Sequence, residues 1–139
     1  VFTNANFKGT NLQNASFRGA KGLRSTNLKE AADLSNCVFS KADLQAIDLS
    51  QAVLIKAEFD RADLTNANLQ EANLSEAQFW GTNLTRANLE GSNFSLLHIR
   101  FDDLDQIKSA KNWEAASYDA DTSLALGLPA KDASVSDDR

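Results

Sequence analysis

Few residues in this 139-residue sequence have the types and spacing that catalysis requires. His98 is the single histidine, at a position expected to face outward, and Cys37 is the single cysteine. The sequence shows no zinc-binding spacing and no Ser/His/Asp constellation. The acidic run "DDLD", Asp102–Asp105, lacks the glycine and the distal glutamate of a calcium-binding loop, and no glycine-rich phosphate loop occurs. The sequence therefore predicts a protein that is not an enzyme, with no catalytic residue, no cofactor and no metal site.

The pattern that dominates the chain is a period of five. In "FDRADLTNANLQEANLSEAQF", Phe59–Phe79, a large apolar residue stands at every fifth position, and an alanine stands two residues before each of the last four. An α-helix advances about 100° per residue and a strand alternates faces, so neither element can turn every fifth side chain toward one core. A chain that turns a corner every five residues can do so.

The same frame extends over about residues 1–106. One extra residue in "GAKGL" and another in "KEAADL" shift it, and from Leu34 onward it is unbroken. Internal repetition of this extent outranks the other signals in the sequence. The predicted central residues number 21: Phe2, Phe7, Leu12, Phe17, Leu23, Leu28, Leu34, Phe39, Leu44, Leu49, Leu54, Phe59, Leu64, Leu69, Leu74, Phe79, Leu84, Leu89, Phe94, Ile99 and Leu104.

Units such as "ADLTN", "ANLQE" and "ANLSE" resemble the A(D/N)LXX repeat of the pentapeptide-repeat proteins, and the resemblance covers roughly three quarters of the chain. It implies an all-β fold: a right-handed, four-sided β-helix of about five coils, with one quintet per side and about 20 residues per coil. The spacing of Phe39, Phe59 and Phe79 agrees with this coil length, and Phe17 joins the same column if the two inserted residues form corner bulges.

The four-sided coil also predicts which outer and inner positions carry small or polar groups. The residue two before each centre must point into a crowded interior, so Cys37 is expected to be a small buried thiol. Thr10, Thr26, Thr82 and Ser92 are expected to point inward too, whereas Ile47 and Leu97 should need local widening. Asp43 and Asp63 would lie one coil apart, at a strand spacing of about 4.8 Å. Such a pair could perform acid–base work or bind a cation, but Asp or Asn precedes most centres, which favours a ladder that hydrogen-bonds its own turns.

After Leu104 the period ends and helix signals begin. Asn112 could cap a helix over 113–118, and Asp121 or Thr122 could cap another that ends at Gly127. We expect residues 107–128 to cap the last coil through an apolar face and residues 129–139 to be a disordered tail. The apolar face comprises Ile107, Trp113, Tyr118, Leu124, Leu126 and Leu128. The sequence "NWEAASYD…LGLP" is similar to the C-terminal segments of cyanobacterial-type members of the family.

Composition narrows the function without identifying it. The net charge is −5 with 24% charged residues, which does not favour direct nucleic-acid binding, and no apolar run approaches the ~18 residues that span a bilayer. The sequence opens within the repeat at Val1, which predicts a processed or engineered start. The compartment is therefore left open between the cytoplasm and, behind a removed leader, the periplasm or thylakoid lumen.

A non-catalytic structural or protein-interaction scaffold is the favoured function, with an unidentified protein partner, no membrane contact, and a monomeric or weakly dimeric state. Trp80, Val53 and Ile55 occupy outer positions where polar residues prevail, and exposed aromatic residues are favoured interface anchors. The alternative is that Trp80 only covers its neighbours, stacked against Arg100 one coil further on. The candidate interaction surface comprises these four residues and the basic residues Lys8, Arg18, Arg24 and Lys29.

The second candidate function follows from the resemblance alone. Some pentapeptide-repeat proteins resemble B-form DNA and protect DNA gyrase from quinolones by occupying its DNA site. A duplex of about 25 Å carries ~15 negative charges, whereas residues 1–106 hold 13 acidic and 10 basic residues, a net charge of −3. Residues 1–29 contain basic residues and no acidic ones, which is the reverse of what a DNA mimic needs.

Overall fold

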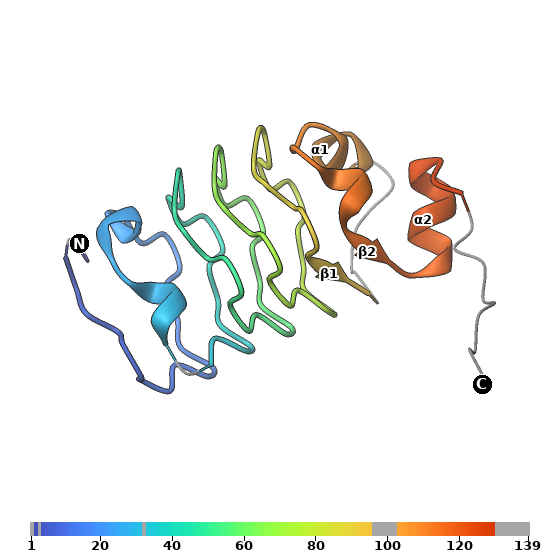
Figure 1. Ribbon diagram of the computed structural model, residues 1–139. Helices are drawn as coiled ribbons and strands as arrows, with labels where there is room; N and C mark the ends of the chain where they lie inside the picture. Colours follow the sequence, from blue (N-terminus) through green and yellow to red (C-terminus); the bar gives the residue numbers. More distant parts are fainter. Residues whose placement is uncertain (1, 3, 32, 96–102, 130–139) are drawn as a thin grey trace, which may run out of the picture.

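The structure, a computed structural model, describes residues 2, 4–31, 33–95 and 103–129. The chain winds into coils that lie side by side along one axis, with the first coil and residues 103–129 at opposite ends (Figure 1). Parallel bridges join residues 20 apart, as in the series from Asp43 to Asp63 to Asn83. The predicted β-helix and its coil length are therefore confirmed.

A tight turn at each corner explains the period of five. At a typical corner the N–H of Ala42 donates to the carbonyl of Phe39 over 2.9 Å. The third residue of that turn, Lys41, has a φ of 61°, a left-handed conformation that lets the chain turn the corner within four residues. Positive φ recurs at this position around the rod, including Gly9, Gly19, Gly81 and Gly91, where glycine adopts it at no steric cost.

The central residues of the quintets form the core. The rings of Phe17, Phe39, Phe59 and Phe79 stack in one column, with centroids 5.2, 5.2 and 5.0 Å apart. We name the four sides by their central residues: face 1 has Phe2, Leu23, Leu44, Leu64 and Leu84; face 2 has Phe7, Leu28, Leu49, Leu69 and Leu89; face 3 has Leu12, Leu34, Leu54, Leu74 and Phe94; face 4 has Phe17, Phe39, Phe59 and Phe79. The coils are numbered 1–5 from the N-terminus.

The turn type changes in coil 2, next to the two inserted residues. The corners after Leu23 and Leu28 are the 3-10 helices η1, Leu23–Ser25, and η2, Leu28–Glu30. Gly22 takes the left-handed conformation just before η1, with a φ of 78°. Both leucines stay fully buried, and the core column continues past them. The N–H of Thr26 donates to the carbonyl of Leu23, so this turn spans four residues like the other corners, and the inserted residues lie outside the helical turns.

From Cys37 to Ser92 the positions two before the centres are buried, as predicted. Nearer the N-terminus the prediction is wrong for Thr10, which is exposed, and Thr26 is half-buried. Thr82 and Ser92 are fully buried, and the hydroxyl of Thr82 donates to the carbonyl of Phe59 over 2.7 Å. The thiol of Cys37 donates to the carbonyl of Leu12 over 3.0 Å, and burial raises its pKa to about 11. Ile47 is also buried, and Leu97 lies outside the described residues.

The C-terminal segment continues the coil edge. Strand β1, Asn93–Phe94, pairs in parallel with β2, Ser117–Tyr118, and the ring of Tyr118 stacks on that of Phe94 with centroids 5.6 Å apart. Around these strands lie α1, Leu104–Lys108, the 3-10 helix η4, Trp113–Ala115, and α2, Ala120–Leu126 (Figure 1). Main-chain bonds also tie Lys111 to Ala87 and Leu89.

Several local predictions for this segment are wrong. The helix predicted over 113–118 is a single turn followed by a strand. Asn112 stands at the N-cap of that turn but makes no side-chain cap bond, and its amide donates to Asn88. The cap of α2 is Asp119, whose carboxylate accepts the N–H of Thr122 over 2.8 Å; its end at Gly127 is as predicted.

The start of the segment and its apolar face also differ from the prediction. Helix α1 crosses the boundary expected between 106 and 107, so Leu104 is helical and is not the centre of a coil side. Leu124 is 78% exposed and does not join the covering apolar face, whereas Ile107 and Leu126 are buried. No helix among the described residues has the length and apolarity needed to cross a membrane.

Candidate functional site

The carboxylates that could have formed a catalytic pair are used by the turns. Asp43 and Asp63 are bridge partners on face 1, yet Asp63 accepts the N–H of Thr65 over 3.0 Å and its hydroxyl over 2.6 Å. The amide of Gln45 donates to the other oxygen of Asp63 over 2.7 Å. No group of three potential metal ligands occurs in the part of the chain that the structure describes. The pair is a hydrogen-bonded ladder, as the repeat pattern predicted.

The same bonds keep these carboxylates ionised. Burial alone would raise the pKa of Asp63, but the hydrogen bonds from Thr65 and Gln45 outweigh it and lower the pKa below the ordinary value of 3.8. For Asp48, burial is again outweighed, by Lys29 and Ser50, and its pKa is also lowered. A carboxylate with a lowered pKa is a poor general base near neutral pH, so this arrangement does not favour acid–base chemistry.

The lowered pKa of Asp63 predicts a measurable acid sensitivity. Because the folded pKa lies below the unfolded one, the stabilisation is present above about pH 4 and is lost as the pH falls through the folded pKa. Asp63→Asn keeps the oxygen that accepts from Thr65 and removes the titration, as Asn68 and Asn73 do at equivalent positions. We expect this variant to melt near the parent at pH 7 and to lose less stability between pH 5 and 2.5. Thermal melts at several pH values test this, and parallel pH profiles would contradict it.

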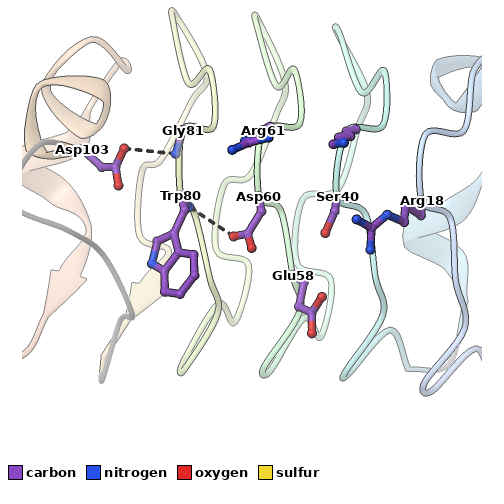
Figure 2. Close-up of a pocket in the computed structure, with 9 residues that line it drawn as sticks. Arg18, Ser40, Glu58, Asp60, Arg61, Trp80, Gly81 and Asp103 are labelled. Atoms are coloured by element: carbon purple, nitrogen blue, oxygen red, sulfur yellow. Dashed lines mark hydrogen bonds between the residues drawn. The ribbon is translucent and has the colours of Figure 1, made fainter.

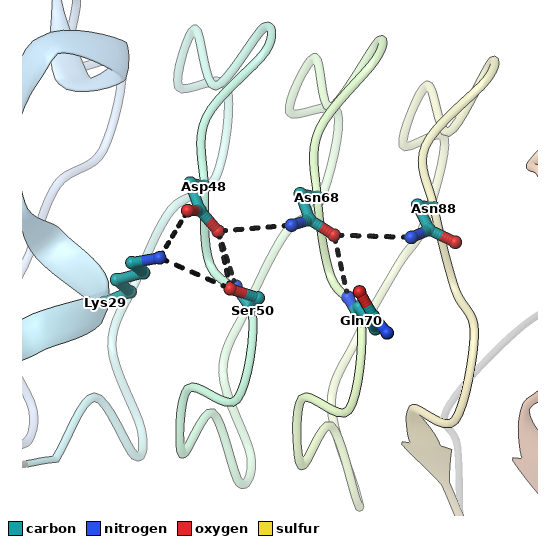
Figure 3. Close-up of polar contacts among 6 residues, drawn as sticks. All are labelled: Lys29, Asp48, Ser50, Asn68, Gln70 and Asn88. Carbon is teal, nitrogen blue, oxygen red and sulfur yellow. Dashed lines mark hydrogen bonds and ion pairs between the residues drawn. The ribbon is translucent and has the colours of Figure 1, made fainter.

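A second polar ladder runs along face 2 (Figure 3). The amide of Asn68 donates to Asp48 over 3.4 Å, that of Asn88 to Asn68 over 3.5 Å, and that of Asn112 to Asn88 over 3.0 Å. Lys29 closes the N-terminal end through an ion pair with Asp48. These groups are engaged along the rod axis, so face 2 offers few free hydrogen-bonding groups to a ligand.

Face 4 carries an open groove with a volume of about 470 Å³. Trp80 is 46% exposed there, and Figure 2 shows it in line with Asp60, Ser40 and Arg18 on successive coils. The groove is also lined by Lys41, Glu58, Arg61, Gly81 and Asp103.

Two carboxylates frame Trp80 from opposite sides along the rod. Asp60 accepts the main-chain N–H of Trp80 over 3.2 Å, and Asp103, beyond the last described coil, accepts the N–H of Gly81 over 3.0 Å (Figure 2). Each of these bonds uses one carboxylate oxygen. Face 4 therefore presents a half-exposed indole between two fixed negative charges, in a groove whose other end is basic.

Comparison with known families agrees with this architecture. A model of pentapeptide repeats matches residues 1–31, 32–70 and 62–96, with eight copies. The chain belongs to the pentapeptide-repeat family. This membership implies the right-handed winding that the sequence resemblance predicted.

Two solved pentapeptide-repeat structures are similar to the chain. One, from the cyanobacterium Cyanothece 51142, is 24% identical, with 83% of this chain and 84% of that chain covered and a TM-score of 0.42. The other, from the Arabidopsis thaliana thylakoid lumen, is 25% identical, with 86% and 89% covered and a TM-score of 0.41. A search of curated proteins finds no match.

The predicted interaction residues of this pentapeptide-repeat protein do not form one surface. Val53, which is 38% exposed, and the half-buried Ile55 lie together on face 3, whereas Trp80 lies on the adjacent face 4. Arg100, the predicted stacking partner of Trp80, lies outside the described residues. The structure therefore separates the three apolar candidates into two sites.

The four basic candidates lie on three different faces of the rod. Lys8 and Lys29 lie on face 2 and form ion pairs with Glu30, at 3.6 Å, and with Asp48. Arg24 lies in η1 on face 1, and Arg18 lies in the groove of face 4. Of these four residues, Arg18 is thus the one that lines the same groove as Trp80.

Sequence reasoning missed the charged lining of the groove. Glu58, Asp60, Arg61 and Asp103 lie beside Trp80 although they are distant from it in sequence. A signal was present: the residue after each phenylalanine of the face 4 column is Arg18, Ser40, Asp60 and Trp80 in turn. Examining that outer column as a unit would have identified the groove.

Proposed function

We propose that this pentapeptide-repeat protein is a non-catalytic scaffold that binds another protein through an exposed side of its β-helix. The observation that carries the proposal is Trp80, a large aromatic side chain left 46% exposed on a regular, hydrogen-bonded face. Tryptophan is among the residues most enriched at the energetic centres of protein interfaces.

The rest of the molecule supports a binding role over a catalytic one. The core is filled by side chains from all four faces, and the outer Asp and Asn residues are engaged by their own turns or by the next coil. Rows of hydrogen-bonded coils give a stiff surface, which lowers the entropy lost on binding.

Nothing in the charge distribution favours the DNA-mimic alternative. The groove of face 4 mixes Arg18, Lys41 and Arg61 with an equal number of acidic residues, and Lys8 and Lys29 lie on face 2. A DNA mimic needs a dense and continuous negative surface. Gyrase binding is therefore not proposed.

Replacing Trp80 tests the proposed function. Trp80→Ala should leave the melting temperature within about 2 °C of the parent, because a half-exposed side chain contributes little to folding. The same change should remove the partner that the intact protein recovers from its source cells in a cross-linked pull-down. Thr85→Ala, at an exposed outer position on face 1, is the matched control and should retain the partner. A variant that loses stability and keeps the partner would assign Trp80 to packing.

A further inference from the structure

We propose that the groove of face 4 binds an extended segment of a partner protein, with an arginine or lysine side chain of the partner on the indole of Trp80 and an acidic side chain four residues away beside Arg18 and Lys41. This inference rests on the proposed function and specifies its partner. It is carried by the order of charges along the groove.

The end of the groove near Trp80 has the chemistry of a cation site. The face of an indole ring attracts ammonium and guanidinium groups, and neighbouring carboxylates add to that attraction. Asp60 and Asp103 are held on either side of Trp80 by their bonds to main-chain N–H groups, and Glu58 lies in the coil next to it (Figure 2). Arg61 is the one basic side chain of the lining at this end, where it lies next to Gly81. An approaching cation therefore meets three carboxylates against one guanidinium.

These charges are available to a partner. Three ion pairs join described residues, and none involves Glu58, Asp60 or Asp103. Each of the two aspartates uses one oxygen for a main-chain bond and leaves the other without a described partner. Arg18, Lys41 and Arg61 likewise form no ion pair with any described residue.

The opposite end of the groove is basic and sets the length of the occupant. Arg18 lies in coil 1, Lys41 follows in coil 2, and Trp80 lies in coil 4, three coils from Arg18. At a coil spacing of about 4.8 Å, Arg18 and Trp80 are separated by roughly 14 Å along the axis. An extended chain covers that distance in about four residues, and side chains four apart point to the same side. The groove thus fits an acidic and a basic side chain at positions i and i+4, in either chain direction.

Selection of short random peptides on the complete protein tests this assignment. Display against the parent, with counter-selection on Trp80→Ala, should enrich peptides that carry Arg or Lys with Asp or Glu four positions away. Fluorescence polarisation then measures the affinity of each variant for these peptides. We expect it to fall roughly tenfold in Trp80→Ala and roughly tenfold in the double variant Asp60→Asn, Asp103→Asn. Both amides keep the oxygens that accept from Trp80 and Gly81, so the main chain should be undisturbed.

Charge exchange gives the most specific test. Arg18→Glu should weaken the selected peptides, and replacing the acidic residue of the peptide by lysine should restore binding to that variant alone. Thr85→Ala on face 1 and Val53→Ser on face 3 should change affinity less than twofold. Peptides without a basic residue, peptides indifferent to Trp80→Ala, or no enriched peptide would each overturn the assignment.

Two further outcomes separate this inference from the proposed function. If peptide affinity falls in Val53→Ser and is unchanged in Trp80→Ala, the binding site lies on face 3. The scaffold function would then stand, and the groove assignment would fail. If Arg100→Ala strengthens peptide binding tenfold or more, the natural occupant of the indole is the chain's own Arg100, and the proposal is overturned. We expect Arg100→Ala to change the affinity less than twofold.

Discussion

Leu84→Asp should unfold the rod, whereas Thr85→Asp, one residue further along the same side, should leave its melting temperature almost unchanged. Leu84 is 1% exposed at the centre of face 1, and Thr85 is exposed outside it. Losing the leucine costs about 1.5–3 kcal/mol of burial, and an unpaired carboxyl in the core costs several kcal/mol more. The sum approaches the whole stability of a small domain, which is about 5–15 kcal/mol.

The comparison is informative because the main difference between the two positions is the direction of the side chain, inward at Leu84 and outward at Thr85. Both lie in coil 5, and both receive the same new side chain. The main-chain N–H of Thr85 donates to the side-chain oxygen of Asn83, and the substitution leaves that bond in place. Circular dichroism melts measure the difference directly. If both variants melt at the parent's temperature, the central residues do not point inward and the four-sided core is wrong.

Much of the fold could be predicted because the period of five has one physical explanation. Most corners place a left-handed residue at the third turn position, as at Lys41, and a small buried residue next to it, as at Ala42. The insertions before Leu23 and Leu34 were located correctly, but their geometry was not predictable. The 3-10 turns after Leu23 and Leu28 span the same four residues as the other corners, so the position of an inserted residue did not reveal the type of turn beside it.

The C-terminal segment was predicted less well because its local signals compete with tertiary pairing. Asn112 is a good helix cap in isolation, but its amide meets Asn88 at the end of a ladder that begins far away in the sequence. Ser117 and Tyr118 extend because β1 supplies a free edge. Propensity within 113–118 contains no information about that edge.

The candidate site shows the same limit. The exposed position of Trp80 followed from the repeat frame, since the residue after each centre points outward. The acidic setting did not follow, because Asp60 and Asp103 come from 20 residues before Trp80 and 23 after it. A β-helix brings such residues together across coils, so its surface chemistry is found in columns, and neighbours along the chain are a poor guide to it.

Deleting residues 103–139 should convert the protein from a single well-behaved species into end-to-end oligomers or aggregate. The deleted segment supplies the edge partners of coil 5: Lys111 bonds to Ala87 and Leu89, and the N–H of Ser117 donates to Ser92 over 2.8 Å. It also supplies the ring of Tyr118 that lies on Phe94, a residue that is fully buried in the intact chain. Without it, unpaired main-chain groups and an apolar surface would face water together, the combination that drives strand edges to pair with other chains.

The control for this deletion is removal of residues 130–139 alone, which leaves α1, β2 and α2 in place and should change neither the oligomeric state nor the melting temperature. Size-exclusion chromatography with light scattering distinguishes the two truncated proteins. Tyr118→Ser offers a milder test, since it removes the ring over Phe94 and the bond from the Tyr118 hydroxyl to Trp113 while keeping the β1–β2 pairing. It should lower the melting temperature without causing association, because the edge stays covered. If the long deletion keeps the parent's mass and stability, coil 5 protects its own edge, and the apolar contacts of Ile107 and Tyr118 cannot be the reason that the rod ends there.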